Sequence, residues 1–136
     1  MSPDERASGP AVRGVQSDVV LVYFACLNTE DWERMATLWT PDACMRAVGA
    51  RPRTGRDEVL GYFRTLFEPW ETHLDSPTRL VRDGDVVVAE VSFTGRTASG
   101  RDAAFDAVDV FDLRDGRIAA LSTWYDLVAA RRAVAP

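Results

Sequence analysis

The chain contains no lysine, one histidine and two cysteines, and each shortage excludes a class of function. All sixteen basic residues are arginine, and the twenty-one acidic residues outnumber them, so the formal net charge is −5. Because nucleic-acid surfaces need clustered positive charge, this balance predicts no nucleic-acid partner. A lone His73 and the separated Cys26 and Cys44, with no Cys-x-x-Cys pair, also predict no transition-metal site.

A long apolar run is missing as well. The longest, residues 19–27, is much shorter than the roughly 20 residues that a helix needs to span a bilayer, so we expect no membrane contact. We expect a cytoplasmic protein in which Cys26 and Cys44 are small, reduced core residues. With 136 residues, 46% of them hydrophobic, the chain can form one domain with a real core. We expect a disordered leader at residues 1–14, the domain at 15–130 and a tail at 131–136.

Helical periodicity dominates the first half of the chain. Residues 17–28, capped by Ser17, predict a helix that is apolar on nearly all sides and therefore buried. Residues 29–39 place apolar side chains at i, i+3, i+4 and i+7, the last being Trp39. Residues 44–48 predict a short strand. A pattern typical of a capping box then precedes a third helix over residues 54–70.

The second half has the pattern of strands joined by tight turns. Asp-Gly, Ser-Gly and Asp-Gly pairs separate four candidate strands, as hairpin turns do. The strands are expected at residues 72–82, 86–97, 101–114 and 117–127. Helices followed by an antiparallel meander predict an α+β fold. We expect a strongly curved, antiparallel or mixed sheet wrapped around the three N-terminal helices, as a cone-shaped barrel with room for a ligand.

Asp109 is an acid within an apolar stripe. Side chains on a strand alternate between faces, so Asp109 points the same way as Phe105 and Phe111, while Asp106 and Val108 point the other way. A carboxylate in such surroundings is costly to ionise, and its pKa rises. Acids of this kind gather at functional sites, but buried acids tied to an arginine or to backbone N–H groups give the same pattern.

Three segments resemble one superfamily, the nuclear-transport-factor-two-like fold. They are YFACLNTEDWERMATLWTPDA at residues 23–43, PRTGRDEVLGYF at 52–63 and DAVDVFDLRDGRIAALSTWYD at 106–126. Within the superfamily the chain is similar to SnoaL-like polyketide cyclases and ketosteroid isomerases. The resemblance implies the cone fold, but the fold serves isomerases, cyclases, dehydratases, hydrolases and binding domains.

The resemblance also implies roles for single residues. Tyr23 falls where ketosteroid isomerases have the tyrosine that donates to the enolate oxygen, and Asp109 falls where they have a second, protonated acid. The general base of those isomerases would lie at residues 45–48, which read MRAV and contain no acid. SnoaL-like cyclases, with an acid/base carboxylate at or near Asp109, resemble the chain better. The Arg-x-Asp pattern of related epoxide hydrolases is missing, since their central strand corresponds to VVAEVSFTG, where Glu90 is the only acid.

Other candidates have both a functional and a structural interpretation. For His73 the alternatives are proton transfer near neutral pH and a surface position, and for Tyr23 they are a role in the site and an ordinary place in the core. Arg46 could pair with Asp109 or bind a carbonyl, and Asp126 could face the cavity mouth. Five aromatic residues are candidates for the substrate-binding wall and for the core: Trp39, Phe63, Phe67, Phe111 and Trp124.

The resemblance therefore implies a cofactor-independent enzyme of bacterial secondary metabolism. We expect Asp109, Tyr23 and His73 to transfer protons on a hydrophobic, carbonyl-bearing, polyketide-derived substrate, giving cyclisation, isomerisation or dehydration. The outward Val108 and Val110 predict a homodimer through the outer face of the sheet. The alternative is a non-catalytic ligand-binding or dimerisation module of the same fold.

Overall fold

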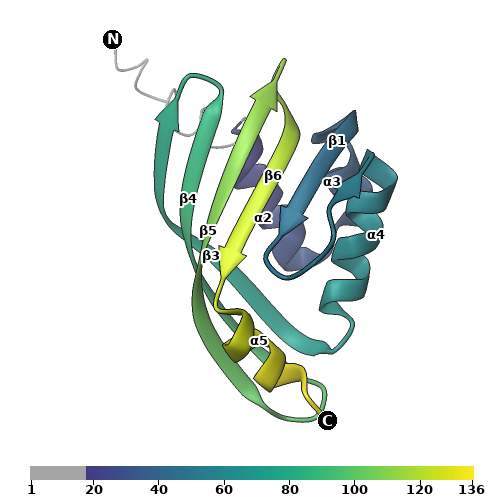
Figure 1. Cartoon of the computed structure of the whole chain (residues 1–136), viewed down its shortest axis with the longest axis vertical. Coiled ribbons are helices and arrows are strands. Elements are labelled where there is room, and N and C mark those ends of the chain that lie inside the picture. The colour runs from purple at the N-terminus through teal and green to yellow at the C-terminus, as the bar shows by residue number, and fades with distance from the viewer. Residues whose placement is uncertain (1–17) are drawn as a thin grey trace.

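A curled, unclosed sheet of six strands forms the frame of the molecule, and the helices lie against its concave side (Figure 1). The computed structural model describes residues 18–136. The strands lie side by side in the order β2-β1-β6-β5-β4-β3. Their bounds are β1 Trp39–Ala47, β2 Arg53–Thr54, β3 Trp70–Asp83, β4 Val86–Thr97, β5 Asp102–Arg114 and β6 Arg117–Tyr125. The α+β class and the cone-shaped arrangement expected from the sequence are confirmed.

Strands β3 to β6 form the predicted antiparallel meander, and β1 joins it in parallel beside β6. The three turns fall at the predicted pairs, where Gly84, Gly100 and Gly116 all have positive φ angles. Such angles suit glycine because it has no Cβ to clash with the backbone. The local turn chemistry therefore fixes the order of the strands in this part of the sheet.

Within residues 18–136, four helices accompany the sheet: α2 Val19–Thr29, α3 Trp32–Ala36, α4 Arg56–Phe67 and α5 Leu127–Val134. Helix α2 is buried on several sides, as its apolar composition predicted. Its cap is Asp18, whose carboxylate accepts from two N–H groups of the first turn, while the expected cap Ser17 lies outside the described residues. No helix within residues 18–136 combines the length and apolarity needed to cross a membrane.

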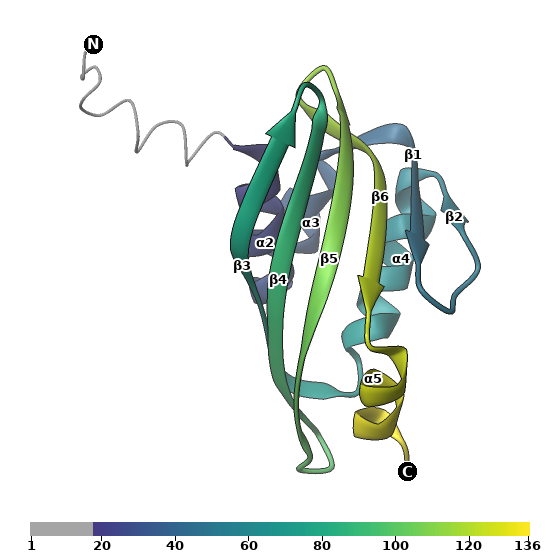
Figure 2. The same cartoon turned by 60° about the vertical axis from the view of Figure 1, so that its left-hand side comes forward.

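Two stretches differ from the sequence-based expectation. The second helix ends at Ala36 because Trp39 already begins β1 and pairs with Ile118 of β6. The last strand ends at Tyr125, and Asp126 caps α5 by accepting from the Ala129 N–H. Residues 131–134, expected in a tail, thus belong to a helix that lies beyond the end of β6 (Figure 2). The expected leader at residues 1–14 lies outside the described part of the chain.

The core lies between the concave face of the sheet and helices α2 to α4. Trp39, Phe63 and Phe111 are among its largest fully buried side chains. Cys26 is buried there, as expected, but Cys44 points outward from β1 and is exposed, which corrects its assignment to the core. The alternation along β1 explains this, since Met45 and Ala47 take the inward positions.

Candidate active site

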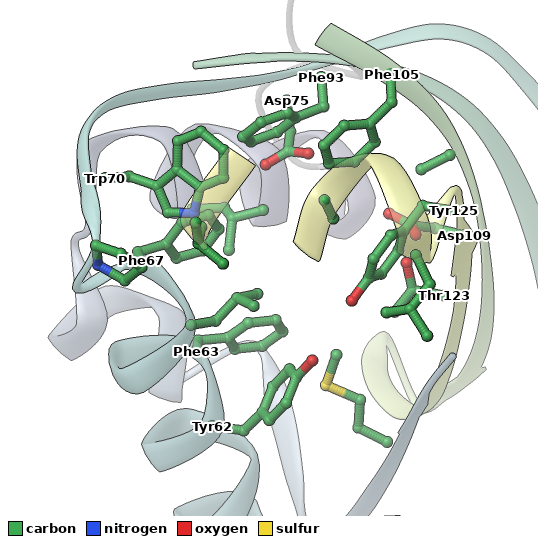
Figure 3. Close-up of a pocket in the computed structure, with 18 of the residues that line it drawn as sticks. Tyr62, Phe63, Phe67, Trp70, Asp75, Phe93, Phe105, Asp109, Thr123 and Tyr125 are labelled. Atoms are coloured by element: carbon green, nitrogen blue, oxygen red, sulfur yellow. The ribbon is translucent and has the colours of Figure 1, made fainter. Parts of the chain in front are cut away.

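A cavity of about 220 Å³ opens within the cone, next to the core (Figure 3). Its wall is mostly aromatic and aliphatic, with a few polar groups that come from different elements. The polar residues are Tyr23, Tyr62, Asp75, Asp109, Thr123, Tyr125 and Arg131. Since a cavity of roughly 150 Å³ suffices to bind benzene, this one can admit a larger ring system.

Asp109 lies on the inner face of β5, with Val108 and Val110 on the outer face, as the alternation predicted. Only 6% of the residue is exposed, and its Oδ1 has no hydrogen-bond partner within residues 18–136. Burial raises the pKa of the carboxyl to about 6, and the hydroxyl of Thr123, opposite on β6, partly offsets the rise. Such a carboxyl can accept and return a proton near neutral pH.

No ion pair in the described part of the chain involves Asp109. The candidate partner from the sequence, Arg46, points away from the cavity and lies over the ring of Trp124, 5.0 Å from its centroid. Both residues are on the outer face of the sheet. Contrary to expectation, Arg46 and Trp124 therefore do not line the substrate cavity. On β1 the inward neighbour of Arg46 is Met45, which does line it.

Tyr23 projects from α2 into the same cavity as Asp109. Its ring is fixed by edge contacts, with centroids 5.1 Å from Phe111 and 6.0 Å from Phe63. Burial, and then the charges of Asp109 and Asp75, raise the pKa of the phenol well above its ordinary value. The hydroxyl therefore stays protonated at every physiological pH and can act as a hydrogen-bond donor.

A second acid, Asp75 on β3, also lines the cavity, and no pattern in the sequence pointed to it. Burial, and then the charge of Asp109, raise the pKa of its carboxyl to about 7. The amide of Asn28, near the end of α2, pairs with the backbone of Asp75. Its Oδ1 accepts from the Asp75 N–H at 2.8 Å and its Nδ2 donates to the Asp75 carbonyl at 2.9 Å. Because β3 is an edge strand, these two groups would otherwise lack a strand partner.

The remaining predicted site residues fall into two groups. Phe63 and Phe67 line the cavity. Trp39 and Phe111 are fully buried in the core and are not part of its wall, because their rings pack behind Tyr23. This is a correction of their expected contact with substrate.

His73 and Asp126 also lie outside the wall. His73 stacks on the far side of the Phe67 ring at 3.9 Å, and its Nε2 is 2.8 Å from Glu30 Oε2. It faces an acid instead of the cavity, which corrects its expected catalytic role. Asp126 is the N-cap of α5, where its carboxylate accepts a hydrogen bond from the Ala129 N–H, so it does not line the cavity as expected.

Several wall residues were not identified from the sequence. Tyr62 of α4 and Tyr125 of β6 direct their hydroxyls toward each other across the cavity (Figure 3). Trp70, Phe93 and Phe105 close the end near Asp75, and α5 contributes Leu127, Ala130, Arg131 and Val134. No cluster of three or more histidine, cysteine or acidic side chains in residues 18–136 is arranged to bind a metal ion.

The fold is that of nuclear-transport-factor-two-like and ketosteroid isomerase-like proteins. The model of the SnoaL-like domain matches residues 20–121, and the chain belongs to this family. A search of the curated proteins finds no match.

Solved structures show the same fold at low sequence identity. A putative SnoaL-like polyketide cyclase from Jannaschia sp. CCS1 is 22% identical, with a TM-score of 0.79 over 96% of this chain and 99% of that one. A ketosteroid isomerase-like hypothetical protein from Catenulispora acidiphila, in complex with trimethylamine, is 19% identical, with a TM-score of 0.78 over 86% and 92%. An epoxide hydrolase from M. tuberculosis is 18% identical, with a TM-score of 0.73 over 88% and 90%.

Proposed function

We propose that the protein is a cofactor-independent enzyme that transfers protons on a hydrophobic, carbonyl-bearing substrate, of polyketide origin, in bacterial secondary metabolism. The observation that carries the proposal is the buried Asp109 carboxyl, which shares an aromatic cavity with the Tyr23 hydroxyl. An acid with a pKa of about 6 beside a phenol that stays protonated is a suitable pair for making an enolate.

In this mechanism Asp109 removes a proton from the carbon next to the carbonyl. The electron pair of the C–H bond moves onto the carbonyl oxygen, and the hydrogen bond from Tyr23 strengthens as negative charge develops there. Asp109, now protonated, returns the proton to the same or another carbon, which gives isomerisation. If the enolate carbon instead attacks a second carbonyl of the molecule, the C=O π electrons move onto that oxygen. The resulting alkoxide takes the proton from Asp109, which completes an aldol-type cyclisation and restores the carboxylate.

Epoxide hydrolysis is less well supported by the cavity. The only acid of β4, Glu90, is on the outer face and forms an ion pair with Arg79 at 3.1 Å. Neither residue lines the cavity. An Arg and Asp pair two residues apart on this strand, which the hydrolase chemistry would need, does not occur in the sequence of β4.

The test uses 2-tetralone, a bicyclic aromatic ketone, in D₂O, with loss of its α C–H signals followed by proton NMR. We expect the protein to accelerate this exchange, and Asp109→Asn to slow the catalysed rate by about 10²–10⁴-fold, the usual contribution of a general base. Tyr23→Phe should slow exchange more than it weakens ketone binding. Asp106→Asn, on the outer face of the same strand, is the matched control and should exchange at the wild-type rate.

Absence of catalysed exchange, or unimpaired exchange by a folded Asp109→Asn variant, would overturn the proposal. The chain would then be a ligand-binding module of the same fold.

We also propose that the protein works in the cytoplasm as a homodimer. The outer face of the sheet carries an apolar patch, defined here as Val81, Val86, Val88, Val108, Val110 and Trp124. Val108 and Trp124 are directly opposite each other on β5 and β6 and are 38% and 43% exposed. A contiguous apolar patch of this kind is typical of a protein interface.

A further inference from the structure

One end of the cavity combines an acid with a row of aromatic rings. Asp75 of β3 is directly opposite Phe93 of β4, and Phe93 is directly opposite Phe105 of β5. All three therefore share the inner face, and Figure 3 shows the Asp75 carboxylate beside both rings. The backbone N–H and C=O of Asp75 bond to Asn28, away from β4. Asp75 and Phe93 are thus a non-hydrogen-bonded pair, the type in which cross-strand side chains come closest.

Trp70 completes this aromatic end. Its ring makes an edge contact with Phe93 at 5.0 Å, and Phe93 stacks on Phe105 at 4.7 Å. Gly95 makes room for the tryptophan, because a Cβ at that position would lie 2.9 Å from Trp70 Cε3 and from the Thr72 carbonyl oxygen. The backbone is therefore adapted to place an indole at this end of the cavity.

The charges of the cavity wall are unbalanced. Its charged residues are two acids, Asp75 and Asp109, and one base, Arg131 of α5. None of the hydrogen bonds or ion pairs in residues 18–136 reaches the side chain of Asp75. Asp109 differs, because the Thr123 hydroxyl lies beside it and can orient it. An acid that transfers protons benefits from such an orienting group, whereas a counter-ion for a ligand does not need one.

We propose that the Asp75 end of the cavity binds a substituted ammonium group of the ligand, between the carboxylate and the rings of Trp70, Phe93 and Phe105. Cations are attracted both to carboxylates and to the faces of aromatic rings, most strongly where water is excluded. The proposal rests on the proposed function, since it adds an amine to the carbonyl-bearing substrate of the same cavity. Asp109 and Tyr23 then act on the carbonyl while Asp75 fixes the cationic end.

The proposal predicts how the affinity for a cation changes with pH. A bound cation favours the ionised form of Asp75, so binding should strengthen as pH rises through about 7 and should release protons. The other titratable groups that face this space are Tyr23 from α2, Tyr62 from α4, Asp109 from β5, Tyr125 from β6 and Arg131 from α5. Asp109, with a pKa of about 6, titrates in the same range, and its ionisation acts in the same direction.

The test compares two probes of the same shape, choline and its neutral carbon analogue 3,3-dimethylbutan-1-ol, by NMR shift titration of the full chain. At about pH 8 we expect choline to bind about tenfold more tightly or better, and the preference to shrink toward unity near pH 5, where both acids are protonated. Asp75→Asn should abolish most of the preference. Asp83→Asn, an exposed acid on the same strand, should preserve it.

Measurements on the wild-type protein are enough to overturn the proposal. Equal affinity for the two probes at pH 8 would do so, and so would a preference for choline that grows as pH falls. An undiminished preference in folded Asp75→Asn would do the same. Tighter binding of the neutral alcohol at pH 8 would also overturn the proposal, because an ionised Asp75 favours the cation. Ketone exchange by Asp109 is measured separately, so failure of the ammonium site and failure of the enzymatic function are distinguishable.

Discussion

The catalytic role of Asp109 and its effect on the free energy of unfolding can be measured separately. Its folded-state pKa, about 6, is above the ordinary 3.8, so between these values the folded chain binds a proton that the unfolded chain has lost. The free energy of unfolding therefore falls as pH rises from about 4 to about 7. A shift of about two units corresponds to at most about 3 kcal/mol. The sign would be opposite for an acid paired with an arginine, whose folded-state pKa is lowered.

We predict that Asp109→Asn gains up to about 3 kcal/mol relative to wild type between pH 4 and pH 8, because the amide does not ionise. Urea melts at the two pH values measure the change. Asp106→Asn, exposed on the same strand, should show no such gain. A variant that instead loses stability relative to wild type on going from pH 4 to pH 8 would indicate a cationic partner for Asp109.

Helix α5 is the element that extends the wall of the cavity beyond the sheet. Leu127, Ala130, Arg131 and Val134 line the cavity, and Arg101 of the β4–β5 turn region ties the helix down by donating to the Arg132 carbonyl at 2.7 Å. The helix has one buried residue, Ala133, so its own contribution to the core is small. We infer that α5 closes the cavity more than it stabilises the sheet.

Removal of residues 127–136 should therefore open the cavity and leave the sheet folded. We expect increased fluorescence of the dye ANS, which binds exposed apolar surface, and ketone binding weakened by about tenfold or more. We expect stability to fall by about 1–3 kcal/mol, the range of ordinary local changes. Removal of Ala135 and Pro136 alone is the control. A truncated chain that binds ketone as tightly as the full chain would show that α5 is not part of the site.

At the scale of the whole molecule, the apolar patch on the outer face predicts the oligomeric state. Val108→Glu introduces a charge at the centre of the proposed dimer interface, where burying it without a partner is strongly unfavourable. We predict a dimer for wild type and a monomer for this variant in sedimentation at micromolar concentration. Val128→Glu, the same change at a 58% exposed position on α5, should leave the dimer intact. A wild-type monomer under these conditions would exclude the interface.

The sequence by itself determined the features that depend on local physics. The glycine turns ordered the meander, the apolar composition of residues 19–29 gave a buried helix, and the alternation along β5 gave the inward direction of Asp109. These signals need only neighbouring residues, because turn geometry and side-chain period are set within a few positions. The resemblance of the quoted segments then sufficed to identify the fold and, by analogy, to suggest Tyr23 and Asp109.

Only the tertiary structure decided the direction of Asp75. Leu80 faces the core, and counting back from it in steps of two would place Leu74 inside and Asp75 outside. A bulge between Pro77 and Arg79 shifts the pairing by one residue, so Asp75 turns inward and Leu74 is 48% exposed. A single extra residue reverses the two faces of a strand, and its position depends on pairing with β4. The second acid of the cavity could therefore not be predicted from the sequence. The outward direction of the Arg46 and Trp124 side chains could not be predicted either, because it depends on the pairing of β1 with β6, two strands that are distant in the chain.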